Sequence, residues 1–290
     1  YIYNASSLLE ARRSCSTTTF DQVASQSLSI TTGPFWAFSD PWLALSRWYD
    51  NQVLFYKRDG NSFTYTETLP PPKNCWFGYS VSMSASGKYM IIGSIVHGGG
   101  FTIYSKNDRN AKWSTASTVR GGTGIHRFGA MARITENYAA VGGGVGTDGN
   151  GYSGHAATAV MKIYGKSASG SWSTNPITTV SGYSSMKSFS AQISMTDTHI
   201  VCPTDEKKVY VFTRSGESWP STATKIYDKS TDARFTSFGV YGSVGINDRY
   251  LAIRSSATFL PGNIQVLIYA YTSEGWTDDF VDVIGSPAGY

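Results

Sequence analysis

Charged residues are scarce in this chain, and their scarcity excludes several classes of function. Only 15% of the 290 residues are Asp, Glu, Lys or Arg, and the formal net charge is +4. The basic residues are scattered, with Arg12-Arg13 and Lys207-Lys208 as isolated pairs, so the concentrated basic patch of a nucleic-acid-binding protein is absent. No apolar run approaches the ~20 residues of a membrane-spanning helix. We therefore expect neither nucleic-acid binding nor a membrane span in this segment.

Helical periodicity is also lacking. No window carries a sustained apolar stripe at helical spacing, which predicts almost no helix. Aromatic residues make up 14% of the chain, which has 19 Tyr and 30 Gly, so we expect strands joined by tight turns. With so few charges, the surface must consist largely of Ser, Thr, Asn and Tyr. Such a composition favours a protein that is secreted or displayed at the cell surface.

Cysteine is rare, and its three copies are placed differently. Cys202 lies in an apolar segment (HIVCP) and is predicted to be a buried, unreactive thiol. Cys15 and Cys75 fall in a turn and in a linker between repeats, where they could form a disulfide in an oxidising compartment. Asn4 begins the sequon Asn4-Ala5-Ser6 and is a candidate glycosylation site. These features fit an extracellular location.

What the chain does contain is a repeated unit, clearest in residues 77–105, which read FGYSVSMSASGKYMIIGSIVHGGGFTIYS. Residues 77–84 alternate between apolar residues and serine, a pattern typical of a half-buried strand. After a turn, the apolar run 88–94 predicts a strand buried on both faces. A Gly-rich loop leads to a third strand (FTIYS), and Trp113 begins a fourth. Four short strands joined by tight turns predict one antiparallel sheet.

The unit recurs along the chain at intervals of about 50 residues. Copies begin at Phe77, Phe128, Phe189 and Phe238 and close at Trp113, Trp172, Trp219 and Trp276. A degenerate copy precedes them and ends at Phe63, which takes the place of the tryptophan. One such sheet cannot bury both of its faces, whereas sheets stacked around an axis can. The repeat therefore predicts an all-β fold, a β-propeller of four-stranded antiparallel blades.

The repeats also resemble a known family. The pattern FG-x-S-V-x-x-S, turn, Y-x-x-V-G, loop, V-Y-V-F-x-R-x-G-x-x-W is spread over five copies in residues 35–285 and is similar to the FG-GAP repeat. The resemblance implies the propeller fold of the integrin α-subunit headpiece and of many secreted propellers of bacteria and protists. This motif is a signature of fold and implies no ligand.

The repeat boundaries predict one propeller domain, residues 1–290. Five complete blades are expected at 34–75, 76–125, 126–186, 187–235 and 236–285. Residues 1–33 resemble the third and fourth strands of a partial blade, and the last five residues resemble the opening of a first strand. This arrangement favours six blades with the two termini closing the ring, and it requires further chain after Tyr290. We therefore expect part of a longer polypeptide; a five-bladed ring with 1–33 as an accessory edge is the alternative.

Metal and catalytic signatures are sparse. In the integrin relatives, calcium is held by Asp/Asn-rich turns between the first and second strands. Here those turns read SASGK, ITENY, TDTH and INDR, too short and too poor in carboxylates for a cation that takes six to eight oxygens. The four histidines lack zinc-ligand spacing, and His199 is expected to be structural. No GxSxG elbow or Walker loop is present. We expect no metal, no cofactor and no catalytic residue.

A binding surface is expected where loops of varied length and chemistry gather on one face of the propeller. In propellers these loops join the second strand to the third, and the fourth strand to the next blade. The candidate binding residues in them are Trp48, Tyr49, His97, Asp148, Asn150 and His155. Trp48 and Tyr49 are the best candidates for a carbohydrate platform or a protein hot spot. Alternatively, they cap the core of their blade.

The sequence thus favours a non-catalytic interaction or structural module outside the cell. Its expected partners are other proteins, or copies of itself in an extracellular assembly. A lectin-like glycan binder is the alternative; it would repeat aromatic and Asn/Asp residues at equivalent loop positions, and that repetition is weak here. A propeller hydrolase or lyase is a third reading, which would need carboxylates or histidines converging in the central channel.

Overall fold

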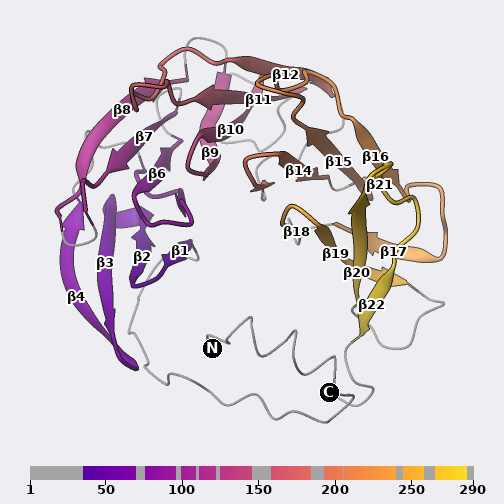
Figure 1. Ribbon diagram of the computed structural model, residues 1–290, viewed down its shortest axis with the longest axis horizontal. Helices are drawn as coiled ribbons and strands as arrows, with labels where there is room; N and C mark the ends of the chain where they lie inside the picture. Colours follow the sequence, from indigo (N-terminus) through magenta and orange to yellow (C-terminus); the bar gives the residue numbers. More distant parts are fainter. Residues whose placement is uncertain are drawn as a thin grey trace.

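The fold is an arc of stacked sheets around an open centre (Figure 1). The computed structural model describes residues 35–69, 76–95, 99–108, 111–121, 125–145, 158–183, 193–204, 206–239, 244–257 and 265–285. These residues form five antiparallel sheets, so the predicted all-β propeller of four-stranded blades is confirmed. The first and last sheets do not meet in Figure 1, and the partial blade predicted at 1–33 lies outside the described residues. The choice between six and five blades therefore stays a prediction.

Blades one to three each contain four strands that pair in the order of the chain. Blade one also contains η1 (Trp48–Asp50), a single 3-10 turn and the only helix in the described ranges. Its strands are β1 (Trp36–Ser39), β2 (Trp42–Arg47), β3 (Gln52–Asp59) and β4 (Ser62–Leu69). Blade two has β5 (Ser80–Met83), β6 (Tyr89–Ser94), β7 (Gly100–Ser105) and β8 (Ser114–Arg120). Blade three has β9 (Ile125–Ile134), β10 (Tyr138–Val145), β11 (Thr158–Gly165) and β12 (Thr178–Tyr183).

Blades four and five continue the arc. Blade four has β13 (Ser194–Met195), β14 (His199–Pro203), β15 (Lys208–Thr213) and β16 (Lys225–Asp228). Blade five has β17 (Phe235–Phe238), β18 (Val244–Ile246), β19 (Tyr250–Ala257), β20 (Gln265–Thr272), β21 (Gly275–Trp276) and β22 (Asp282–Gly285). Because β17 and β18 both pair with β19, and β21 and β22 both pair with β20, this sheet also has four strand positions. In blades one, three and five, β1, β9 and β18 lie nearest the centre (Figure 1), and β5 and β13 hold the same edge position in their sheets.

The hydrophobic core is divided among the interfaces between neighbouring blades, which we call seams. At the seam of blades one and two, Val53 and Phe55 pack against Phe77, Ile92 and Trp113. The next three seams are filled in the same way, each by residues of two blades. The tryptophans that close the repeats are all buried. Both faces of most sheets are thus covered, as stacking around an axis requires.

Serines that alternate with apolar residues at the start of blade two are buried, which makes the predicted half-buried strand wrong. Ser80, Ser82 and Ser84 are all buried, because blade three covers the face on which the serines lie. The Ser80 hydroxyl donates a hydrogen bond to the Gly129 carbonyl at 2.8 Å. The approach is close: a Cβ on Gly93 would lie 1.9 Å from that same carbonyl oxygen. Serine and glycine therefore allow β5 and β6 of blade two to approach β9 of blade three across this seam.

A cation packs on an aromatic ring at three successive seams. At the seam of blades two and three, Lys166 lies 4.4 Å from the ring centre of Tyr89, which meets the closing Trp172 edge-on at 5.5 Å. At the next seam, Arg214 packs on Tyr138 in the same way. Such contacts contribute roughly 0.5–2 kcal/mol each. At the seam of blades one and two, the corresponding residue is Lys106, which is considered in the Discussion.

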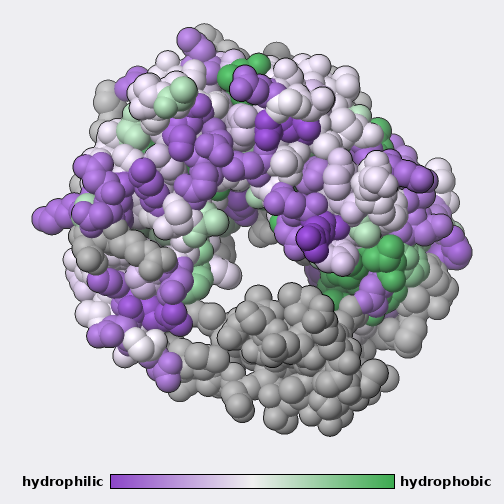
Figure 2. All heavy atoms as spheres, viewed as in Figure 1, coloured by the Kyte–Doolittle hydropathy of each residue, from purple (hydrophilic) through white to green (hydrophobic). Residues whose placement is uncertain are grey.

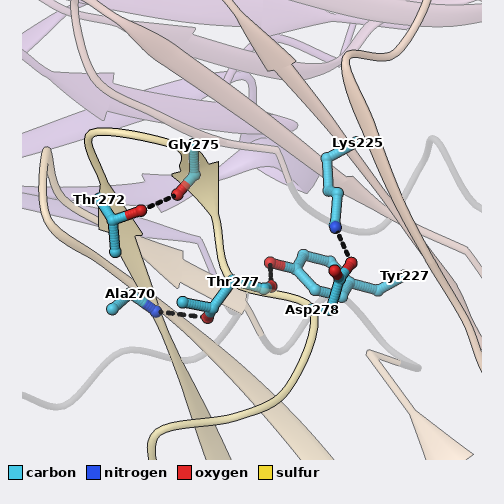
Figure 3. Close-up of polar contacts among 7 residues, drawn as sticks. All are labelled: Lys225, Tyr227, Ala270, Thr272, Gly275, Thr277 and Asp278. Atoms are coloured by element: carbon cyan, nitrogen blue, oxygen red, sulfur yellow. Dashed lines mark hydrogen bonds and ion pairs between the residues drawn. The ribbon is translucent and has the colours of Figure 1, made fainter.

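The seam of blades four and five is held by a different set of contacts. At this seam His199 stands where Tyr89 and Tyr138 stand at the two preceding seams. Its ring lies edge-on to that of Trp276, with ring centres 5.0 Å apart. Figure 3 shows the polar contacts nearby: the Tyr227 hydroxyl donates to the Thr277 carbonyl at 2.7 Å, and Lys225 forms an ion pair with Asp278. A hydrogen bond and an ion pair thus join this seam, where each of the other seams has a cation packed on an aromatic ring.

Candidate functional site

A group of aromatic side chains gathers where the β2–β3 loop of blade one meets the start of blade two. Trp48 and Tyr49, both in η1, stack with ring centres 3.5 Å apart and an interplanar angle of 29°. Trp48 also meets Trp76 and Tyr79 edge-on, at 5.2 and 5.4 Å. Phe35 completes the group by packing on Tyr79 at 5.4 Å. We call these five residues the aromatic cluster.

Hydrogen bonds from blade one hold this loop to blade two. Asn51 adopts a left-handed conformation after η1, and its side-chain oxygen accepts a hydrogen bond from the Phe77 amide at 3.1 Å. The buried Ser46 hydroxyl donates to the Gly78 carbonyl. Gly78 has a φ of +92°, and a Cβ there would lie 2.8 Å from the Ser46 hydroxyl oxygen, so only glycine fits. The aromatic cluster is therefore fixed by both blades.

Trp76 has a positive φ of 51°, which is uncommon for a bulky residue. Arg127 has nearly the same φ, 52°, and it also immediately precedes the Phe-Gly that begins a blade. Blades two and three share this conformation, whereas Ser237, which precedes Phe238-Gly239 in blade five, lacks it. Blade two differs in having a tryptophan at this position, and the backbone directs that side chain to Trp48.

The aromatic cluster exposes one ring to solvent. Tyr49 is 62% exposed, while Trp48, Trp76 and Tyr79 are half-buried beneath or beside it. The charged neighbours in the same turn, Arg47 and Asp50, form an ion pair with each other. The cluster thus offers an exposed aromatic face supported by packed rings, an arrangement suited to binding.

Trp48 and Tyr49 are the predicted site residues that the structure describes, and it brings them together. They lie outside the five hydrophobic core clusters. Sequence reasoning missed Trp76 and Tyr79, since the first was given no role and the second was assigned to the alternating strand. The signal that could have found Trp76 is a tryptophan directly before Phe-Gly. Outside the described residues lie His97, Asp148, Asn150, His155, Asn4, Cys15 and Cys75.

Two residues predicted to be structural are confirmed as such. Cys202 is a free, fully buried thiol, and burial raises its pKa well above the usual range. His199 is also buried; its Nδ1 lies 3.2 Å from the Thr213 hydroxyl. Burial lowers the pKa of His199, with the negative charge of Asp248 opposing the shift. Neither residue is accessible to a ligand.

Two further observations concern metals and membranes. Among the described residues, no three His, Cys, Asp or Glu side chains lie close enough together to hold a metal ion. The single 3-10 turn found in those residues is far too short to cross a membrane.

Comparison with known proteins shows similarity in fold. No protein-family model and no curated protein matches the chain. The periplasmic gluconolactonase PpgL of Pseudomonas aeruginosa matches with a TM-score of 0.52 and 11% identity, over 90% of this chain and 74% of its own. Saccharomyces cerevisiae Sqt1 matches with a TM-score of 0.49 and 13% identity, over 86% of this chain and 61% of its own. This chain therefore spans less than two thirds of Sqt1.

A third match is the β-propeller domain of Myceliophteria thermophila Cps50 (Swd1), with a TM-score of 0.48 and 8% identity over 87% of this chain and 73% of its own. Identities this low show fold and not family. With its stacked four-stranded sheets, the chain is a β-propeller.

Proposed function

We propose that this propeller is a non-catalytic interaction module that binds another protein through the aromatic cluster. The observation that carries the proposal is Tyr49, an exposed tyrosine stacked on a tryptophan that is itself packed against residues of the next blade. Large aromatic side chains dominate the energetics of protein interfaces. Because the ring is already held in place, little conformational entropy is lost when a partner covers it.

The proposed setting is extracellular, in an FG-GAP-like propeller that belongs to a larger polypeptide or assembly. Support comes from the sequence: a surface poor in charge, the sequon at Asn4 and the spacing of the repeats. The partner is another protein of that assembly or a second copy of this chain.

A glycan is the second candidate ligand, and the exposed stacked ring of Tyr49 favours it. The apolar face of a sugar packs on an aromatic ring, and the neighbouring Asp50 and Arg47 offer hydrogen-bonding groups. A single such cluster predicts weak binding of one sugar ring, in contrast to the many contacts of a protein interface.

Two matched substitutions test the site. Tyr49→Ala removes the exposed ring of the cluster, and Tyr65→Ala removes an exposed ring on the outermost strand of the same blade, where Tyr65 is 53% exposed. If the cluster is the binding site, Tyr49→Ala weakens partner or glycan binding by about 2 kcal/mol or more, roughly thirtyfold, as hot-spot residues do. Tyr65→Ala leaves it unchanged. Equal affinities for the unaltered protein and Tyr49→Ala would exclude the cluster.

A further inference from the structure

Serines on the innermost strands supply acceptors across the seams. The Ser82 hydroxyl oxygen accepts a hydrogen bond from the Ile134 amide of blade three at 3.4 Å. In the same way, Ser194 of blade four accepts from the Ile246 amide of blade five at 3.2 Å. Innermost strands are sheet edges, so their outward amides have no partner in the ladder. Each serine satisfies one of these amides.

Arg133 occupies the equivalent place at the seam of blades three and four. It stands two residues before the Thr135 that begins the turn, as Ser82 precedes Ser84 and Ser194 precedes Thr196. Its neighbour along the same face, Met131, packs into the core shared with blade four, whereas Ala132 and Ile134 pack toward blade two. Arg133 therefore lies on the face directed at blade four.

The amide across this seam belongs to Met195. Met195 directly precedes the turn that begins at Thr196, as Ile134 precedes Thr135 and Ile246 precedes Asn247. Its side chain packs against the core of this seam, so β13 lies beside β9 here. An arginine carries donors only, so it cannot accept from the Met195 amide as a serine does.

The guanidinium of Arg133 also has few acceptors. Among the described residues its one hydrogen bond runs from Nη1 to the carbonyl of the adjacent Ala132, at 3.1 Å. It forms no ion pair with a carboxylate of the described residues. The carboxylate of the adjoining turn, Asp197, accepts instead from Thr135 and from Asn137. Burial lowers the pKa of Arg133 because the charge is poorly solvated. Among the described residues, this seam therefore has donors in excess of acceptors.

We propose that the inner seam of blades three and four binds a small oxyanion, a phosphate or a carboxylate group, between the Arg133 guanidinium and the Met195 amide. A guanidinium fork matches two oxygens of such a group, and hydrogen bonds between charged partners are the strong ones. The innermost strands border the centre of the arc, which Figure 2 shows to be open to solvent. The site is separate from the aromatic cluster and adds a second ligand to the proposed function.

Isothermal titration calorimetry of the whole chain with inorganic phosphate, and separately with acetate, tests the proposal. Arg133→Ser places at this seam the residue that the neighbouring seams already use, so it restores an acceptor for the Met195 amide. We expect saturable phosphate binding in the unaltered protein and at least about tenfold weaker binding in Arg133→Ser. Arg133→Lys keeps the charge and loses the two-pronged guanidinium. Its affinity for phosphate is expected to lie between those of the unaltered protein and Arg133→Ser.

Ser194→Ala is the matched control, because it removes the acceptor at the next seam and leaves Arg133 intact. It is expected to bind phosphate as the unaltered protein does. Binding of acetate as well as phosphate assigns the site to carboxylates too, including those of a partner protein; binding of phosphate alone assigns it to tetrahedral anions. Absence of saturable binding of both anions to the unaltered protein overturns the proposal, whatever the variants do. Equal affinity in Arg133→Ser overturns it as well.

Discussion

Lys106 is the most unusual charge in the protein, and its titration is predicted to govern how stability depends on pH. The side chain is only 2% exposed. Its Nζ lies 3.3 Å from the ring centre of Trp42 and 4.3 Å from that of Trp113, and it has no hydrogen-bond partner among the described residues. Loss of hydration lowers its pKa from 10.5 to about 8, with the negative charge of Glu67 opposing the shift.

The sign of the effect follows from proton binding in the two states. Between about pH 8 and 10.5 the unfolded chain keeps the lysine proton and the folded protein releases it. The unfolded state therefore binds more protons, and the free energy of unfolding rises with pH in this window. The full difference in pKa between the two states corresponds to about 3 kcal/mol in the free energy of unfolding. Between pH 8 and about 9.5 the free energy of unfolding rises by about 2 kcal/mol of this. Attraction of the ammonium to two indoles, about 0.5–2 kcal/mol each, reduces this gain.

Urea unfolding at a series of pH values between about 7 and 9.5 measures the effect. The unaltered protein is expected to gain stability above pH 8, by about 1–2 kcal/mol. Lys106→Met, which fills the same space without a charge, and Lys106→Arg, which stays charged throughout, are expected to lack this gain. At pH 7 Lys106→Met should be at least as stable as the unaltered protein, because removing a buried charge offsets the lost contact with the rings. A parallel rise with pH in all three proteins would refute the reasoning.

Three further predictions concern the packing between blades. Ser82→Ala leaves the Ile134 amide without its acceptor and should lower the free energy of unfolding by about 1–2 kcal/mol, as measured in urea; a loss below about 0.3 kcal/mol would contradict it. Gly93→Ala forces β6 of blade two away from β9 of blade three, because its Cβ would overlap the Gly129 carbonyl, and should cost about 3 kcal/mol, seen as a lower Tm; an unchanged Tm would show that these two strands separate freely. Cys202 should react with a thiol reagent only when the protein unfolds, given its burial and raised pKa; rapid labelling in native buffer would exclude this packing.

The fold was largely predictable because each blade repeats the same chemistry. The spacing of Phe77 and Phe128, and of the closing tryptophans, follows from the need of each sheet to bury both faces. The error concerned Ser80 and Ser82. A period of two predicts one solvated face for an isolated sheet, but stacking on both sides buries that face, and only the partner blade shows what the serines bind.

The candidate site was half predictable. Trp48 and Tyr49 stood out because aromatic residues are unusual in a loop between short strands. Trp76 and Tyr79 did not, because their role depends on Asn51 and Ser46 drawing the loop of blade one onto blade two. Contacts between residues so far apart in the chain arise from tertiary packing, which local periodicity does not encode.

The central claim, that the aromatic cluster is the surface through which this propeller meets a partner, is tested most directly by photo-crosslinking. A photoreactive phenylalanine analogue is placed at position 49 and, in a second variant, at position 65, which is also exposed. Each variant is irradiated in the cells that produce the protein, together with their medium. The account predicts one discrete protein adduct from position 49, absent from position 65 and competed by excess unaltered protein. No adduct from position 49, or the same adducts from both positions, would contradict it.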